Sequence, residues 1–220
     1  MNMINTNGEK ETSTTHSTYL TLRDMILTGA LPAGQKIKIE TLRKKLDTGA
    51  SPIREALSLL TSDLLVERLD QRGFRAAPAS TENFAEILKL RCTLEDLALR
   101  QSIEKVNQEW EERLVLSHHR VKRAANSEAF EEAHKSFHMT LVSNAASPMM
   151  ERYCSQLYDL NIRYRNLAAS EENYQSRDIS TEHDEIFEAT IKRDSDTASA
   201  ALISHYRLTG EYLTAQLSQL

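Results

Sequence analysis

Residues 51–75 read SPIREALSLLTSDLLVERLDQRGFR. The opening pair Ser51-Pro52 predicts the start of a helix, because serine caps helices and proline fits their first turn. Apolar residues then recur on one helical face over 53–65. Two strand-like segments follow on either side of the polar turn 70–73 and predict a short hairpin. A short helix with Arg54 near its start, followed by a basic-tipped hairpin, is typical of a winged helix-turn-helix that contacts DNA.

The segments before this stretch complete the predicted domain. Apolar residues at helical spacing predict a first helix over 17–28, and Gly29 ends it. A brief second helix is expected over 39–46, with Arg43 and Lys44 on its exposed side. With the hairpin, these helices predict a DNA-binding domain over 16–79.

Residues 1–15 are polar and contain no apolar run long enough for a signal peptide or a membrane span. We therefore expect a disordered arm there and no membrane association. Cys92 and Cys154 lie far apart in helical patterns, which favours free buried thiols and a cytoplasmic location.

Charge is divided unevenly along the chain. The 220 residues carry a formal net charge of −5, yet residues 1–80 hold 11 Lys and Arg against 9 Asp and Glu. The excess of negative charge therefore lies entirely in the C-terminal part. DNA contacts depend on a local basic face and not on the average charge. This distribution indicates an N-terminal DNA-binding domain and a second domain over 80–220 with a different function.

Helical periodicity fills the C-terminal domain. The expected fold is mostly α: an N-terminal winged helix-turn-helix with a small β-hairpin wing, and a C-terminal six-helix antiparallel bundle. The six predicted helices span 81–104, 107–125, 127–145, 149–168, 179–192 and 194–217.

Four of the seven histidines fall on apolar helical faces. His134 and His138 are four residues apart and project from one face of a helix. His183 and His205 lie among apolar residues of later helices. Such histidines are either hydrogen-bonded core residues or ligands of a metal site inside the bundle, since neutral imidazole suits zinc and nickel. The pair His118-His119 lies in a basic, polar stretch and is interpreted as solvated.

The N-terminal motifs LRDMILTGALPAGQKI, SPIREAL and LLVERLDQRGFR closely resemble the DNA-binding domain of GntR-family bacterial repressors. This resemblance covers about residues 19–77. It implies that Arg54 lies in the reading helix near DNA and that Arg72-Gly73 enters the minor groove at the wing tip. Arg43, Lys44 and Ser51 complete the residues that we expect to contact DNA.

The chain departs from this family at Ala50, where many members carry an arginine. The loss of one bidentate contact to guanine removes about 1–3 kcal/mol of base discrimination. The operator of this protein therefore need not follow the usual sequence of the family.

The C-terminal part resembles the FadR C-terminal-type (FCD) effector domain in its six-helix, VanR-like form. Members of that group bind a metal through an aspartate, a histidine four residues later and two further histidines. The resemblance therefore implies that His138, His183 and His205 are metal ligands and that His134 stands in the aspartate's place. The motifs that carry it are Leu90-Arg91, Leu94-Glu95, the run from His134 to His138, the run from Glu182 to Ile186, and Ser204-His205-Tyr206.

The change from aspartate to His134 alters the charge of the predicted site. Four neutral imidazoles leave a divalent metal at +2, so an anionic effector gains more from coordinating it. Glu131, three residues earlier, is an alternative source of the carboxylate. Zinc is the expected metal, with nickel and manganese as alternatives.

The same resemblance implies a small carboxylate effector. In similar domains an arginine at the position of Arg91 receives the effector carboxylate. Arg163 and Arg165 add two guanidiniums on a helix expected to lie beside the site. A guanidinium and a metal together suit a carboxylate or a dicarboxylate. Arg163 and Arg165 have a second interpretation, as ion pairs at the surface or at a dimer interface.

Taken together, the motifs predict a ligand-responsive repressor that binds double-stranded DNA at a palindromic operator as a homodimer. The alternative is a metal-dependent hydrolase fused to a DNA-binding module. Glu131 and His134 form half of a di-iron motif, but Ser180 stands where the second glutamate would be needed. No HExxH or phosphate-binding loop occurs either, and a hydrolase has no use for a winged helix. We therefore expect a regulator and not an enzyme.

Overall fold

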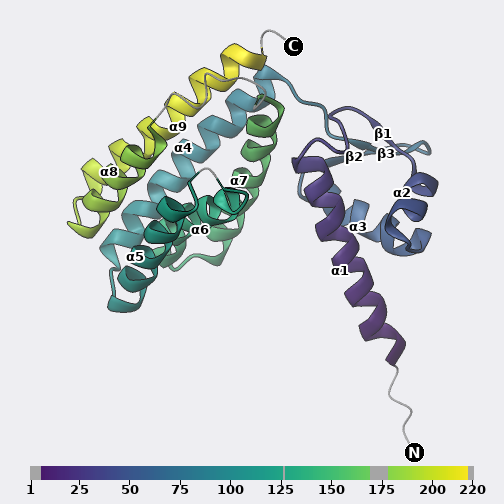
Figure 1. Cartoon of the computed structure of the whole chain (residues 1–220), viewed down its shortest axis with the longest axis horizontal. Coiled ribbons are helices and arrows are strands. Elements are labelled where there is room, and N and C mark those ends of the chain that lie inside the picture. Colours follow the sequence, from purple (N-terminus) through teal and green to yellow (C-terminus); the bar gives the residue numbers. More distant parts are fainter. Residues whose placement is uncertain (1–5, 126, 169–177, 218–220) are drawn as a thin grey trace, which may run out of the picture. The chain divides into compact units, whose positions relative to one another are not determined.

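A computed structural model of the chain describes residues 6–125, 127–168 and 178–217 (Figure 1). The chain divides into two compact units. The first comprises residues 1–80 and 162–167, and the second comprises residues 81–161 and 168–220. The predicted fold class, mostly helical with a small antiparallel sheet, is confirmed.

The first unit is a winged helix-turn-helix. Its strands form a three-stranded antiparallel sheet in the order β1-β3-β2, with Phe74 opposite both Ile37 and Arg68. Helix α1 packs against α3, and α2 packs against α3 as well. The elements are α1 (Thr6–Leu27), β1 (Lys36–Ile37), α2 (Ile39–Leu46), α3 (Ala50–Ser62), β2 (Val66–Leu69) and β3 (Gly73–Ala76).

Helix α1 begins much earlier than the sequence predicted. The predicted start was residue 17, after a disordered arm over 1–15, but the helix already runs from Thr6. The arm is thus corrected for residues 6–15, while residues 1–5 lie outside the described part. Extending a formed helix adds one hydrogen bond per residue, and the Thr15 hydroxyl also donates to Glu55 of α3 at 2.9 Å.

Helix α3 differs from its prediction at both ends. It starts at Ala50 with Gly49 as the cap residue, so the hydroxyl of Ser51 is not the cap and donates instead to Glu55 Oε1 at 3.2 Å. It ends at Ser62, so the predicted helical segment 53–65 is too long, and Leu64 at its end has a φ of 62° and is exposed. The chain turns there, and Leu65 takes the buried place.

The second unit contains six α-helices among its described residues, as predicted. Helix α9 lies along α4 and α8, and α5 packs on α6 (Figure 1). A Cβ atom on Gly210 of α9 would come within 2.3 Å of Leu88 Cδ2, so this glycine permits a close approach to α4. The helices are α4 (Thr81–Glu104), α5 (Gln108–Arg123), α6 (Phe130–Val142), α7 (Pro148–Ala168), α8 (Ile179–Ile191) and α9 (Ser195–Leu217), and a 3-10 turn, η1 (Ser143–Ala145), follows α6.

The core of the second unit is built around Trp110 of α5. Its ring is fully buried, and its Nε1 donates to the Thr140 carbonyl at 2.7 Å, which satisfies its polar atom. Phe137, Leu141 and Ile186 belong to the same apolar cluster. Helices α6 and α8 therefore carry core residues next to the histidines that they bring together.

Candidate metal centre and DNA-binding surface

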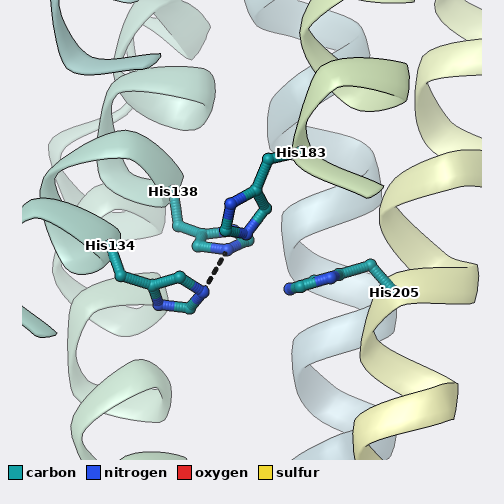
Figure 2. Close-up of side chains that lie close together, drawn as sticks. All are labelled: His134, His138, His183 and His205. Atoms are coloured by element: carbon teal, nitrogen blue, oxygen red, sulfur yellow. Dashed lines mark hydrogen bonds between the residues drawn. The ribbon is translucent and has the colours of Figure 1, made fainter. Parts of the chain in front are cut away.

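Four histidines from three helices meet inside the second unit. His134 and His138 come from α6, His183 comes from α8 and His205 comes from α9 (Figure 2). Each of the four residues is at least 96% buried. One ligand atom from each imidazole lies within 4.8 Å of the others. The four histidines that the sequence named as metal ligands therefore lie together, and their role as ligands stays a prediction.

The spacing of the nitrogens suits a metal ion. The Nε2 atoms of His134 and His138 lie 3.3 Å apart. Four nitrogen ligands at tetrahedral zinc, each about 2.0–2.1 Å from the ion, lie about 3.3 Å from one another. The donor set also suits zinc or nickel, since both accept imidazole nitrogen.

The outward nitrogens of three imidazoles are engaged by neighbouring groups. His134 Nδ1 lies 2.6 Å from the Tyr158 hydroxyl, and His138 Nδ1 lies 2.9 Å from the Tyr206 hydroxyl. His205 Nδ1 lies 2.7 Å from Glu182 Oε2. A proton on each Nδ1 leaves the Nε2 lone pair directed into the cluster, which is how metal-binding histidines are oriented.

Carboxylates lie behind these imidazoles. Tyr158 donates to Glu131 Oε1 at 2.5 Å, and Tyr206 donates to Glu95. With Glu182, three carboxyl groups contact the imidazoles directly or through a tyrosine. Glu95 is itself paired with Arg91, so its charge is already compensated. Because Glu131 Oε1 lies 4.0 Å from His134 Nδ1, it supports that histidine and does not join the cluster itself.

Arg91 is buried beside this network. Its Nε donates to Glu95 Oε1 at 2.7 Å, and its Cζ lies 4.1 Å from the ring centre of Tyr206 and 5.2 Å from that of Tyr158. Burial by itself lowers the pKa of Arg91, but the charge and hydrogen bond of Glu95, together with Tyr206 and Tyr158, outweigh it and the pKa is raised. Burial, with the charge of Glu95, also raises the pKa of Tyr206 well above its usual value. Both groups therefore keep their protons.

Arg163 and Arg165 are not brought to the histidines. Arg163 belongs to the first unit, where its Nη2 donates to the carbonyl of Ala77. Burial lowers the pKa of this guanidinium. Arg165 is half-buried in the same unit. The sequence could not show this, because helical spacing does not say which neighbour a long helix meets along its length.

The interpretation of His118 as solvated is wrong. Its ring stacks on Phe187 at 4.0 Å between centres, and its Nε2 lies 2.8 Å from Asp184 Oδ1. Burial lowers the pKa of His118 in spite of the Asp184 carboxylate. His119 is exposed, as predicted. His118 therefore packs between helices α5 and α8 and lies outside the metal cluster.

The residues expected to contact DNA are all exposed on the first unit. Arg54 and Ser51 lie on α3, and Arg43 and Lys44 lie on α2. Arg43 is paired with Glu40 at 3.0 Å, a contact that a phosphate can replace. Arg72 lies in the turn between β2 and β3 and Gly73 is the first residue of β3, and Gln71 and Gly73 have positive φ.

Tyr158, Tyr206 and Glu182 belong to the site but were not predicted as site residues. Two of them could have been found from the sequence because they are neighbours of predicted metal ligands: Glu182 precedes His183 and Tyr206 follows His205. Tyr158 had no such signal, because only the packing of α7 on α6 brings its hydroxyl to His134.

Comparison with known proteins identifies the family of the chain. The description "Bacterial regulatory proteins, gntR family" matches residues 14–75, and "FCD domain" matches residues 86–208, more than half of the chain. The chain belongs to the GntR family of bacterial regulatory proteins. As a GntR-family protein with an FCD domain it is a transcriptional regulator and not an enzyme, so the hydrolase alternative is wrong.

Relatives within this family extend over most of the chain. The HTH-type transcriptional regulator BphR of Paraburkholderia xenovorans (strain LB400) is 34% identical, over 86% of this chain and 80% of BphR. The HTH-type transcriptional repressor GlaR of Escherichia coli (strain K12) is 26% identical, over 85% of this chain and 90% of GlaR.

Solved structures match the fold at lower identity. McbR/YncC of E. coli superposes with a TM-score of 0.79 at 18% identity, covering 92% of this chain and 98% of that one. A GntR regulator from Rhodococcus sp. RHA1 gives a TM-score of 0.75 at 18% identity, covering 91% of this chain and 97% of the other. None of the described helices is both long and apolar enough to cross a membrane.

Proposed function

We propose that this regulator is a repressor that senses a small carboxylic acid through a divalent metal held by its four buried histidines. It acts in the cytoplasm as a homodimer on a palindromic operator. The observation that carries the proposal is the convergence of four imidazole nitrogens within 4.8 Å. The name of GlaR, a repressor, supports the sign of regulation.

In this proposal His134, His138, His183 and His205 hold the ion, with zinc favoured over nickel and manganese. A bound metal would supply a Lewis-acidic position for a carboxylate oxygen. His134 is favoured over Glu131 as the fourth ligand. Its Nε2 lies 3.3 Å from that of His138, while the Glu131 carboxylate accepts a bond from Tyr158.

Arg91 is the proposed anchor for the carboxylate of the effector. The guanidinium of Arg91 contacts the rings of Tyr158 and Tyr206, whose hydroxyls contact His134 and His138. Only these tyrosine side chains therefore separate Arg91 from the histidine cluster. The bonds to Glu95 use Nε and Nη2, and a guanidinium has five N–H donors, so donors remain for a second carboxylate. Arg163 and Arg165 have no part in this proposal.

A thermal-shift screen of small mono- and dicarboxylates tests the sensing. With zinc present, the matching acid at 100 times its Kd should stabilise the protein by about 2.7 kcal/mol. For a protein of this size that corresponds to a rise in Tm of roughly 5–10 °C. The same acid should give no shift after treatment with a chelator. An equal shift with and without metal would contradict the metal-dependent part.

Replacing Arg72 by alanine should weaken DNA binding, because the residue projects from the wing tip. We expect a lower affinity for every DNA duplex tested. The plot of log K for DNA binding against the logarithm of the salt concentration should become less steep by about one. Fluorescence anisotropy over a salt series measures both. Arg152→Ala removes an exposed arginine from α7 and should leave the slope unchanged. Unchanged binding by Arg72→Ala would place the DNA contacts elsewhere.

A further inference from the structure

The outward face of α5 carries apolar side chains at its midpoint. Trp110, Leu114 and Val121 point into the core. On the outer side, Val115 is 50% exposed and Leu116 is 47% exposed. Together with Ile191, which lines the same hollow, they form a contiguous apolar surface, and such surfaces mark places that another chain covers.

Two grooves run along this exposed ridge, one on each side. The first lies between α5 and α6, and small residues of α6, including Ala133 and Ser136, line it. The second lies towards Ile191 at the end of α8 and is mainly apolar. Leu116 and His119 border both grooves. The surface thus offers a ridge between two hollows, which is the shape that a second helix packs against.

The charges along this face are opposite at its two ends. Glu109 and Glu112 lie in the first half of α5, and Arg120 and Arg123 lie in the second half. Within the described part of the chain no ion pair is seen for these four residues, and Glu112 accepts a hydrogen bond from Gln108 at 2.8 Å. Leu116 stands four residues from both Glu112 and Arg120, or about 6 Å along the axis in each direction.

We propose that this face, the α5 surface of Glu109, Glu112, Leu116, Arg120 and Arg123, is the twofold interface with a second copy of the chain. In an antiparallel pair centred on Leu116, Glu112 of each copy comes opposite Arg120 of the other. Glu109 and Arg123 are brought together in the same way. A twofold interface must be self-complementary, and this surface meets that condition in charge and in shape. The inference adds a surface to the proposed homodimer and does not depend on the metal or the effector.

A comparable apolar residue elsewhere lacks this pattern. Leu97 of α4 is 48% exposed. Its charged neighbours Asp96 and Arg100 already bond each other at 2.8 Å within the helix. Leu97 is therefore a matched control for Leu116.

Charge reversal tests the interface directly. The proposed dimer has two equivalent contacts between position 112 of one copy and position 120 of the other. Glu112→Arg alone turns both into arginine–arginine contacts, and Arg120→Glu alone turns both into glutamate–glutamate contacts. Like charges in contact oppose association strongly, so each single variant should raise the dimer Kd by about 100-fold. The double variant, E112R with R120E, restores the pairing and should dimerise like the wild type. Sedimentation velocity at several concentrations measures the Kd.

Mixing the two single variants gives the sharpest result. Each should be monomeric alone, and an equimolar mixture should form heterodimers, since both pairings are then complementary. Leu116→Glu should dissociate the dimer, while Leu97→Glu should not. A dimeric wild type with unchanged single variants would overturn the α5 interface and leave the proposed repressor intact. A monomeric wild type would overturn both the interface and the proposed homodimer.

Discussion

Replacing His138 by alanine is expected to lower the bound metal from about one ion per chain to near zero, because a tetrahedral site loses one of four ligands. His138 is fully buried and its Nε2 faces that of His134. The loss also removes the stabilisation that binding provides, about 2.7 kcal/mol at a free metal concentration of 100 times the Kd. Elemental analysis of the purified protein and thermal unfolding with and without chelator measure the two effects.

The matched control for this variant is His119→Ala. His119 is an exposed histidine of the same unit and lies outside the cluster, so its loss should leave the metal content unchanged. His205→Ala removes a ligand from a different helix and should reproduce the loss even if His138→Ala folds poorly. Equal metal content in the wild type and in both ligand variants would refute the site.

Replacing Glu95 by alanine is expected to destabilise the fold by about 3–5 kcal/mol, because it leaves the buried charge of Arg91 without a partner. The side chain of Arg91 is 4% exposed and that of Glu95 is fully buried, with 2.7 Å between Nε and Oε1. Tyr206 would lose its acceptor at the same time. Chemical denaturation followed by circular dichroism gives the change in the free energy of unfolding.

A double variant separates stability from sensing. Arg91→Met with Glu95→Leu replaces the ion pair by apolar side chains of similar volume, which is often neutral for stability. We expect this protein to regain most of the lost free energy, yet to lose the thermal shift that the carboxylate causes in the wild type. A double variant that still responds to the acid would show that Arg91 is not the anchor.

Much of the fold could be predicted because the deciding signals are local. Helical periodicity over 81–217 predicted six helices, and the polar turn 70–73 between two strand-like segments predicted the wing. The boundaries of α3 were less accurate, since the apolar position Leu64 fits the helical pattern but adopts a left-handed conformation after the helix has ended. Periodicity reports which face is apolar and says little about where a helix stops.

The sequence by itself determined which residues are able to form the candidate site. The four-residue spacing of His134 and His138 puts both on one face of any helix, and the apolar surroundings of His183 and His205 bury them. Only the tertiary structure decided that α6, α8 and α9 bring the four rings together. It likewise decided that tyrosines contact the outer nitrogens of His134 and His138, that Glu182 contacts that of His205, and that Arg163 lies elsewhere. The physical reason is that backbone periodicity sets the direction of a side chain, whereas its partner on another helix depends on how the whole core packs.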